Sequence, residues 1–105
     1  FKQAMSKIIQ LIKNKNKNKK KPNTKAKFIC SLTVCFNQKE KITTTGTIHG
    51  NISEKMLGKN GFGYDSIFIP AKYNITFGQM GKRKKMLIDH RYLAFKKLKK
   101  KINTL

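Results

Sequence analysis

The stretch Gly58-Lys59-Asn60-Gly61-Phe62-Gly63-Tyr64-Asp65 differs in composition from the rest of the chain. It holds three glycines, two aromatic residues and one of the four acidic residues within eight positions. Glycines allow tight turns and let a ligand approach the main chain closely. The flat faces of Phe62 and Tyr64 and the acceptor oxygens of Asp65 suit a flat ligand with polar edges, such as a purine base. A glycine-rich turn before a buried strand, with Asp65 capping the turn, explains the same residues equally well.

A second informative region lies between residues 81 and 103. Residues 82–88 predict a short helix, and Asp89 stands at the N-cap of a longer one. His90 and Arg91 then fall in the first turn, where positive charge opposes the helix dipole. This placement favours a binding role for the pair, although two ordinary exposed polar residues remain the alternative. Four apolar residues at helical spacing predict the buried stripe of the longer helix: Ala94, Phe95, Leu98 and Ile102.

The remaining segments predict a mixture of helices and strands. Residues 1–13 have the apolar spacing of an amphipathic helix, and residues 13–27 form a Lys/Asn-rich loop without apolar surface to bury. Residues 28–36 and 41–50, joined by a polar turn, predict a β-hairpin. Two shorter segments are expected to be a strand that ends at Pro70 and either a strand or a helix lead-in: residues 66–69 and 76–80.

The net charge of +21 comes almost entirely from lysine, which supplies 23 of the 25 basic residues. Lysine, asparagine and isoleucine together make up 44 of 105 residues, and all three are favoured by A/T-rich codons. A protein that reads nucleic acid is expected to use more arginine. We therefore interpret the charge as a background property that attracts polyanions weakly, and we expect no specific nucleic-acid partner.

Cysteine usage and hydropathy bear on the compartment. Cys30 and Cys35 lie an odd number of residues apart on one predicted strand, so they point to opposite faces and are expected to be free thiols. No Cys/His cluster has metal-binding spacing. No apolar run approaches the roughly 20 residues of a membrane-spanning helix, and the segment after Phe1 does not resemble a signal peptide. A cytoplasmic protein without a membrane partner is expected.

The order and spacing of these motifs resemble one family. Gly61-Phe62-Gly63-Tyr64-Asp65, with His90-Arg91-x-x-Ala94 beginning 25 residues after Asp65, is similar to the C-terminal half of the non-standard purine nucleoside triphosphate pyrophosphatases. These enzymes act on inosine and xanthosine triphosphates. Lys85 lies five residues before His90, where the family has a lysine. The strand that begins at Ala26 is also similar, and the likeness covers most of residues 26–98.

Three positions depart from the family pattern. Ser66 stands where the family has proline, which loosens the turn without moving Asp65. Asp89 stands in place of a serine, and both residues are good N-caps. Gln79 occupies a position at which the family often has an acidic residue.

The resemblance implies a mixed α/β, ITPase-like fold: an elongated twisted sheet flanked by helices, with the substrate cleft between two lobes. Residues 1–105 would be the C-terminal part of one such domain, without its N-terminal half. In the family that half carries the phosphate-binding loop and the acidic residues that hold Mg2+ and activate water. We therefore expect no catalytic residue and no metal ligand in this chain, and we expect the chain alone to be inactive.

The implied reaction is hydrolysis of (d)ITP or XTP to the nucleoside monophosphate and pyrophosphate, which cleanses the nucleotide pool. Family members are commonly homodimers. The implied role of this chain is to recognise the purine base: one aromatic residue stacks on it, the glycine backbone walls it, and cationic side chains donate to O6. The expected substrate-binding residues are Phe62, Gly63, Tyr64, Asp65, Lys85, His90 and Arg91. Two alternatives remain, a small basic RNA-binding protein and a noncatalytic paralogue that serves dimerisation.

Overall fold

The computed structural model describes residues 1–104. Its fold is mixed α/β, which confirms the predicted class, with three helices and a sheet in the strand order β1-β2-β3. The elements are α1 (Lys2–Asn16), β1 (Lys25–Cys35), β2 (Lys41–Ile52), the 3-10 turn η1 (Asp65–Ile67), β3 (Phe68–Pro70), the 3-10 turn η2 (Phe77–Gln79), α2 (Lys82–Met86) and α3 (His90–Asn103). Two compact units can be distinguished: Phe1–Ala26 with His49–Lys82, and Lys27–Ile48 with residues 83–104. We call them the first and second unit.

The hairpin formed by β1 and β2 follows the alternation predicted from the sequence. Every second residue of β1 is half-buried and those between are exposed, so Cys30 and Cys35 lie on opposite faces as free thiols. On the exposed face Ser31 bonds Thr45 and Thr33 bonds Thr43, which fixes an antiparallel register. The turn is closed by Asn37, whose side-chain oxygen accepts from the backbone N–H groups of Lys39 and Glu40.

Helix α1 continues beyond the end predicted for it, so the Lys/Asn-rich loop is shorter than residues 13–27. Lysine is a good helix former, and lysines in the last turn complement the helix dipole. The helix therefore runs through Asn16, and β1 begins at Lys25. Asn16 closes the intervening loop, because its side chain donates to the carbonyl of Asn23 at 3.0 Å and accepts from the N–H of Asn23 at 2.9 Å.

The core of the first unit gathers around β3, which pairs antiparallel with β2 in the register Gly50↔Pro70 and Ile52↔Phe68. Phe68 stacks on Phe77 with ring centroids 5.5 Å apart, and both rings are fully buried. Ile67, which precedes Phe68 in the sequence, and Met80, three residues after Phe77, are also buried. Met5 is the buried residue of α1. Buried apolar side chains thus stabilise β3 in addition to its backbone hydrogen bonds with β2. The strand is shifted from the predicted residues 66–69, because the 3-10 turn η1 includes residues 66 and 67.

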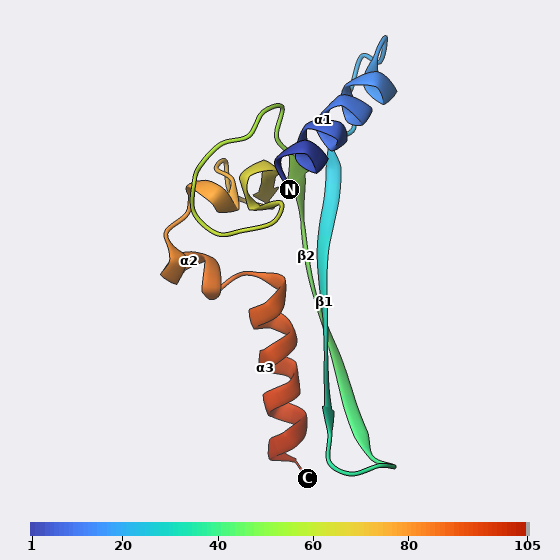
Figure 1. Ribbon diagram of the computed structural model, residues 1–105, viewed down its shortest axis with the longest axis vertical. Coiled ribbons are helices and arrows are strands. Elements are labelled where there is room, and N and C mark those ends of the chain that lie inside the picture. The colour runs from blue at the N-terminus through green and yellow to red at the C-terminus, as the bar shows by residue number, and fades with distance from the viewer. Residues whose placement is uncertain (105) are drawn as a thin grey trace. The chain divides into compact units, whose positions relative to one another are not determined.

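In the second unit α3 runs alongside the hairpin (Figure 1), where the buried hydroxyl of Thr44 donates to the carbonyl of Ala94 at 2.8 Å. Ala94 and Leu98 are buried, as predicted. The other half of the predicted stripe is wrong: Phe95 is 54% exposed and Ile102 is 39% exposed. Helical spacing places the four residues on one side, but only part of that side meets the hairpin. Among the described helices, none has the length and apolarity needed to cross a membrane.

Candidate functional site

The glycine loop, residues 58–65, forms a shallow pocket of about 150 Å³ in the first unit. Part of its wall is backbone, because three of its eight lining residues are glycines, Gly58, Gly61 and Gly63, each with a positive φ angle. We call this hollow the loop pocket. It is lined by Gly58, Lys59, Asn60, Gly61, Phe62, Gly63, Asp65 and Ser66. A backbone-walled hollow offers peptide N–H and C=O groups to a ligand at close range.

Asp65 holds the loop closed. Its carboxylate is 5% exposed, and Oδ2 accepts from the backbone N–H of Phe62 at 2.9 Å. A Cβ atom at Gly61, where φ is +74°, would overlap the same oxygen, so the carboxylate occupies the space that the missing side chain leaves. The turn cap, one of the two interpretations drawn from the sequence, describes this hydrogen bond.

The two aromatic residues of the loop have different surroundings. Phe62 is 60% exposed and lines the loop pocket. Tyr64 does not line the pocket and packs edge-on against Phe1, with ring centroids 5.5 Å apart and an interplanar angle of 83°. Within the pocket the aromatic face available for stacking therefore belongs to Phe62.

The second cluster of predicted residues lies where α2 leads into α3, in the second unit. Asp89 caps α3 as predicted: its Oδ1 accepts from the N–H of Tyr92 at 2.8 Å. The carboxylate of Asp89 also places a negative charge at the N-terminus of α3. This charge offsets the unfavourable interaction of His90 and Arg91 with the helix dipole. Lys85 is 7% exposed, and its carbonyl accepts from the N–H of Asp89 at 2.9 Å.

The start of α3 is fixed against the hairpin by close backbone packing. A Cβ atom at Gly46 would overlap the carbonyl oxygen of His90 and the amide nitrogen of Ala94, so the helix can approach β2 only at a glycine. The His90 ring packs against the Phe28 ring at 5.2 Å between centroids. Arg91 follows on the exposed side of the first turn. Close packing at Gly46 thus fixes where the helix meets the hairpin.

The predicted substrate-binding residues therefore form two groups. Phe62, Gly63 and Asp65 line one hollow in the first unit. The other group, Lys85, His90 and Arg91, belongs to the second unit. Whether the two groups share one substrate stays a prediction.

Comparison with known proteins assigns the chain to a family. Residues 1–101 match the Ham1 family. The chain belongs to the Ham1 family. This confirms the resemblance recognised in the glycine loop and the His90-Arg91 motif.

Relatives and solved structures of the family resemble this chain over part of their own length. The chain is 40% identical over 82 residues to the dITP/XTP pyrophosphatase of Clostridium tetani, covering 78% of this chain and 41% of that protein. It is 42% identical over 80 residues to the dITP/XTP pyrophosphatase of Oceanobacillus iheyensis, with coverages of 76% and 41%. The Staphylococcus aureus Ham1 protein superposes with a TM-score of 0.76 at 32% identity, covering 91% of this chain and 49% of that one. The chain thus spans about two fifths of the curated relatives it matches.

Part of the support for the glycine loop was not predicted from the sequence. Asn60 donates from its backbone to the Gly78 carbonyl at 2.8 Å and from its side chain to the Met80 carbonyl at 2.9 Å. Thr76 and Gln79 form a capping box at η2, a segment for which a strand or a helix lead-in was expected. The signal was present, since Thr-x-x-Gln is a capping-box pattern. Gln79, a departure from the Ham1 family pattern, therefore has a contact in this structure.

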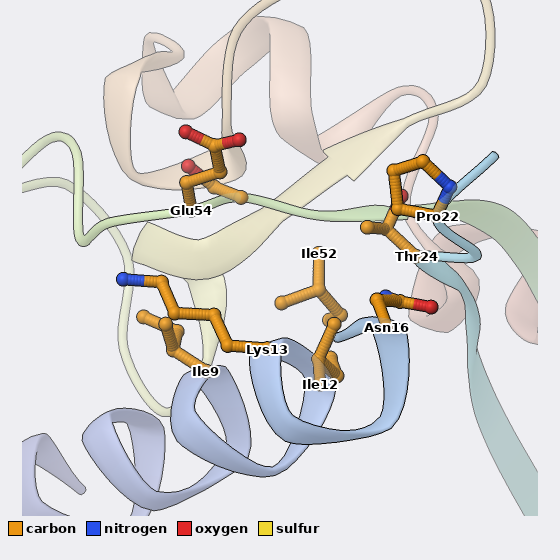
Figure 2. A pocket seen from close by; sticks show the side chains of 9 residues that line it. Ile9, Ile12, Lys13, Asn16, Pro22, Thr24, Ile52 and Glu54 are labelled. Carbon is orange, nitrogen blue, oxygen red and sulfur yellow. The ribbon is translucent and has the colours of Figure 1, made fainter. Parts of the chain in front are cut away.

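A second and larger pocket of the first unit contains none of the predicted residues. It measures about 220 Å³ and lies between α1 and the end of β2, where Ile52 points toward Ile12 (Figure 2). Lys13 and Glu54 flank it, and the full lining is Ile9, Ile12, Lys13, Asn16, Pro22, Thr24, Ile52, Ser53 and Glu54. This groove is lined by both apolar and polar residues, and none of its lining residues belongs to the glycine loop or to the start of α3.

The histidine, cysteine, aspartate and glutamate side chains are the candidate metal ligands of the chain. Within residues 1–104, no three His, Cys, Asp or Glu side chains lie close enough to hold a metal ion. In two of the four acidic residues, Asp65 and Asp89, a carboxylate oxygen accepts a hydrogen bond from a backbone N–H. The described residues thus offer no cluster of three such ligands to a metal ion.

Proposed function

We propose that the protein to which these residues belong hydrolyses dITP and XTP to the monophosphate and pyrophosphate, and that this chain recognises the purine base. The observation that carries the proposal is the loop pocket with Phe62 exposed over a glycine backbone, in a Ham1-family chain. The two relatives described above are named dITP/XTP pyrophosphatases. The proposed role in the cell is removal of non-standard purine nucleotides from the pool.

Base selection follows from hydrogen-bond polarity. A 6-oxopurine presents an acceptor at O6 and a donor at N1, whereas adenine presents the reverse pattern. We propose that Phe62 stacks on the base and that Arg91 donates to O6, with His90 donating to a base or ribose oxygen. A mismatched base leaves buried polar groups unpaired, and such mismatches discriminate by on the order of 10⁴-fold in the best cases.

Four of the predicted substrate-binding residues have more limited proposed roles. Lys85 is almost completely buried, and a buried ammonium group requires partners, so its proposed role is to orient the base-binding residues or to donate to O6. Gly63 supplies backbone wall, and Tyr64 packs behind it. Asp65 sets the shape of the loop by accepting from Phe62.

The chemical step is proposed to use residues outside this chain. Magnesium, as the proposed cofactor, would be held by ligands beyond residues 1–105, because the described residues offer no cluster for it. We further propose a cytoplasmic homodimer, in keeping with the family resemblance. The exposed lysines of α3 add a positive field that attracts a polyanionic nucleotide.

The test compares substrates in the full native protein that contains these residues. Pyrophosphate release is measured with dITP, XTP and dATP, and the isolated 105-residue chain serves as the matched control. We expect a strong preference of kcat/KM for dITP and XTP over dATP, and no release by the isolated chain. Equal rates with dATP would refute base selection. Tight, salt-sensitive RNA binding without hydrolysis would support the basic RNA-binding alternative instead.

A further inference from the structure

Turn η2 of the first unit is bonded directly to the start of the glycine loop. Thr76 is fully buried, and its hydroxyl donates to the carbonyl of Leu57 at 2.6 Å. Oε1 of Gln79 accepts from the backbone N–H of Thr76 at 3.0 Å, so Gln79 holds Thr76 in the conformation that reaches Leu57. Through Thr76, η2 is thus hydrogen-bonded to Leu57, the residue directly before the glycine loop.

Asn60 bonds the same two segments from the loop side. Its backbone N–H reaches Gly78 and its side-chain amide reaches Met80, at 2.8 and 2.9 Å. Together with Thr76, this gives three hydrogen bonds between residues 57–60 and η2 with its flanking residues. We call Asn60, Thr76 and Gln79 the loop brace.

The two segments also touch backbone to backbone. A Cβ atom at Gly58, where φ is +95°, would overlap the carbonyl group of Gly78. A Cβ atom at Gly78 would lie 2.8 Å from the carbonyl oxygen of Leu57 and 2.8 Å from Cα of Ser66. The glycines therefore permit the close contact that the brace holds, and neither position has room for a side chain.

We propose that the loop brace positions the glycine loop for base binding, so that Asn60, Thr76 and Gln79 are positioning residues of the purine pocket. This inference rests on the proposed function. All the residues that line the loop pocket lie between Gly58 and Ser66 and three of them are glycines, so the shape of the pocket depends on where the loop backbone is held. A displacement of about 1 Å at a binding group costs up to about 100-fold in rate.

The chemistry of each member supplies matched variants. Thr76→Val keeps the shape and loses the donor to Leu57, whereas Thr76→Ser keeps the donor. Gln79→Leu loses the acceptor for the Thr76 N–H, whereas Gln79→Glu keeps it, because a carboxylate oxygen accepts in the same way. If the brace positions the loop, Thr76→Ser and Gln79→Glu should keep the dITP binding that Thr76→Val and Gln79→Leu weaken.

The experiment uses the full native protein and steady-state kinetics with dITP. We expect Thr76→Val and Gln79→Leu to raise KM about 10-fold, the equivalent of one hydrogen bond, and to change kcat much less. We expect Thr76→Ser and Gln79→Glu to stay within about twofold of the native KM. A purely structural role would lower the amount of folded enzyme, so kcat would fall with KM unchanged, and that result would overturn the proposal.

Amide hydrogen exchange separates this inference from the proposed function. Exchange of the amides of residues 57–65 should be faster in Thr76→Val than in Thr76→Ser, while the amides of α3 remain unchanged. A native protein that releases no pyrophosphate from dITP overturns the proposed function, and exchange then decides whether the brace holds the loop. Native exchange rates in both Thr76→Val and Gln79→Leu would overturn the brace itself.

Discussion

Replacing Asp65 by alanine tests how the glycine loop keeps its shape. The carboxylate is 5% exposed and accepts from the N–H of Phe62 at 2.9 Å. Asp65→Ala removes this acceptor and leaves the N–H of Phe62 unsatisfied next to a small hollow beside Gly61. Asp65→Asn is the matched control, since its amide oxygen can still accept but carries no charge.

The magnitude follows from that single contact. A hydrogen bond to a charged group contributes about 1.5–3 kcal/mol, and a neutral acceptor gives about half as much. We therefore expect Asp65→Ala to lower the free energy of unfolding by about 1.5–3 kcal/mol and Asp65→Asn by about half of that. Since natural domains are stable by about 5–15 kcal/mol, both variants should remain folded.

Urea unfolding of the full native protein measures the effect, with an unchanged m-value as the sign that only stability changed. The reasoning is refuted if Asp65→Ala is as stable as the native protein, or if Asp65→Asn is the less stable of the two variants. Kinetics with dITP add a second readout. A large rise of KM in Asp65→Asn without loss of stability would assign the carboxylate to the base rather than to the turn.

Two further predictions concern the start of α3. Arg91→Ala should weaken dITP binding or base discrimination by about 1–3 kcal/mol, and Arg91→Lys should recover only part of it, because lysine lacks the planar fork of donors; unchanged dITP kinetics in Arg91→Ala would contradict the assignment. Asp89→Ala should lose about 1 kcal/mol of stability with its N-cap, whereas Asp89→Ser should lose little. Equal unfolding midpoints for Asp89→Ala and Asp89→Ser would argue against the cap.

Features that depend on neighbouring residues could be predicted from the sequence. The β1–β2 hairpin followed from period-two alternation, and the cap at Asp89 followed from its place before the helical pattern. Both features are set by interactions between residues that lie within a few positions of one another in the sequence. The family assignment was predictable for the same reason, because its motifs are short and closely spaced.

Features that depend on distant contacts were missed or wrong. Phe95 and Ile102 have core spacing, but the sequence does not say which part of a helix face meets a partner. The donation from Thr76 reaches Leu57, 19 residues earlier, which no local pattern specifies. The extension of α1 to Asn16 was missed because lysine and asparagine were interpreted as loop composition.

The pair formed by Asn16 and Asn23 has a consequence for how this gene can change. The two hydrogen bonds between the Asn16 side chain and the Asn23 backbone hold the two ends of the lysine-rich loop together. Residues 17–22 lie between these fixed ends. Doubling such a loop costs only about 0.6 kcal/mol in closure entropy. Lysines and asparagines can therefore be added or deleted there, and the fixed ends shield α1 and β1 from the change in length.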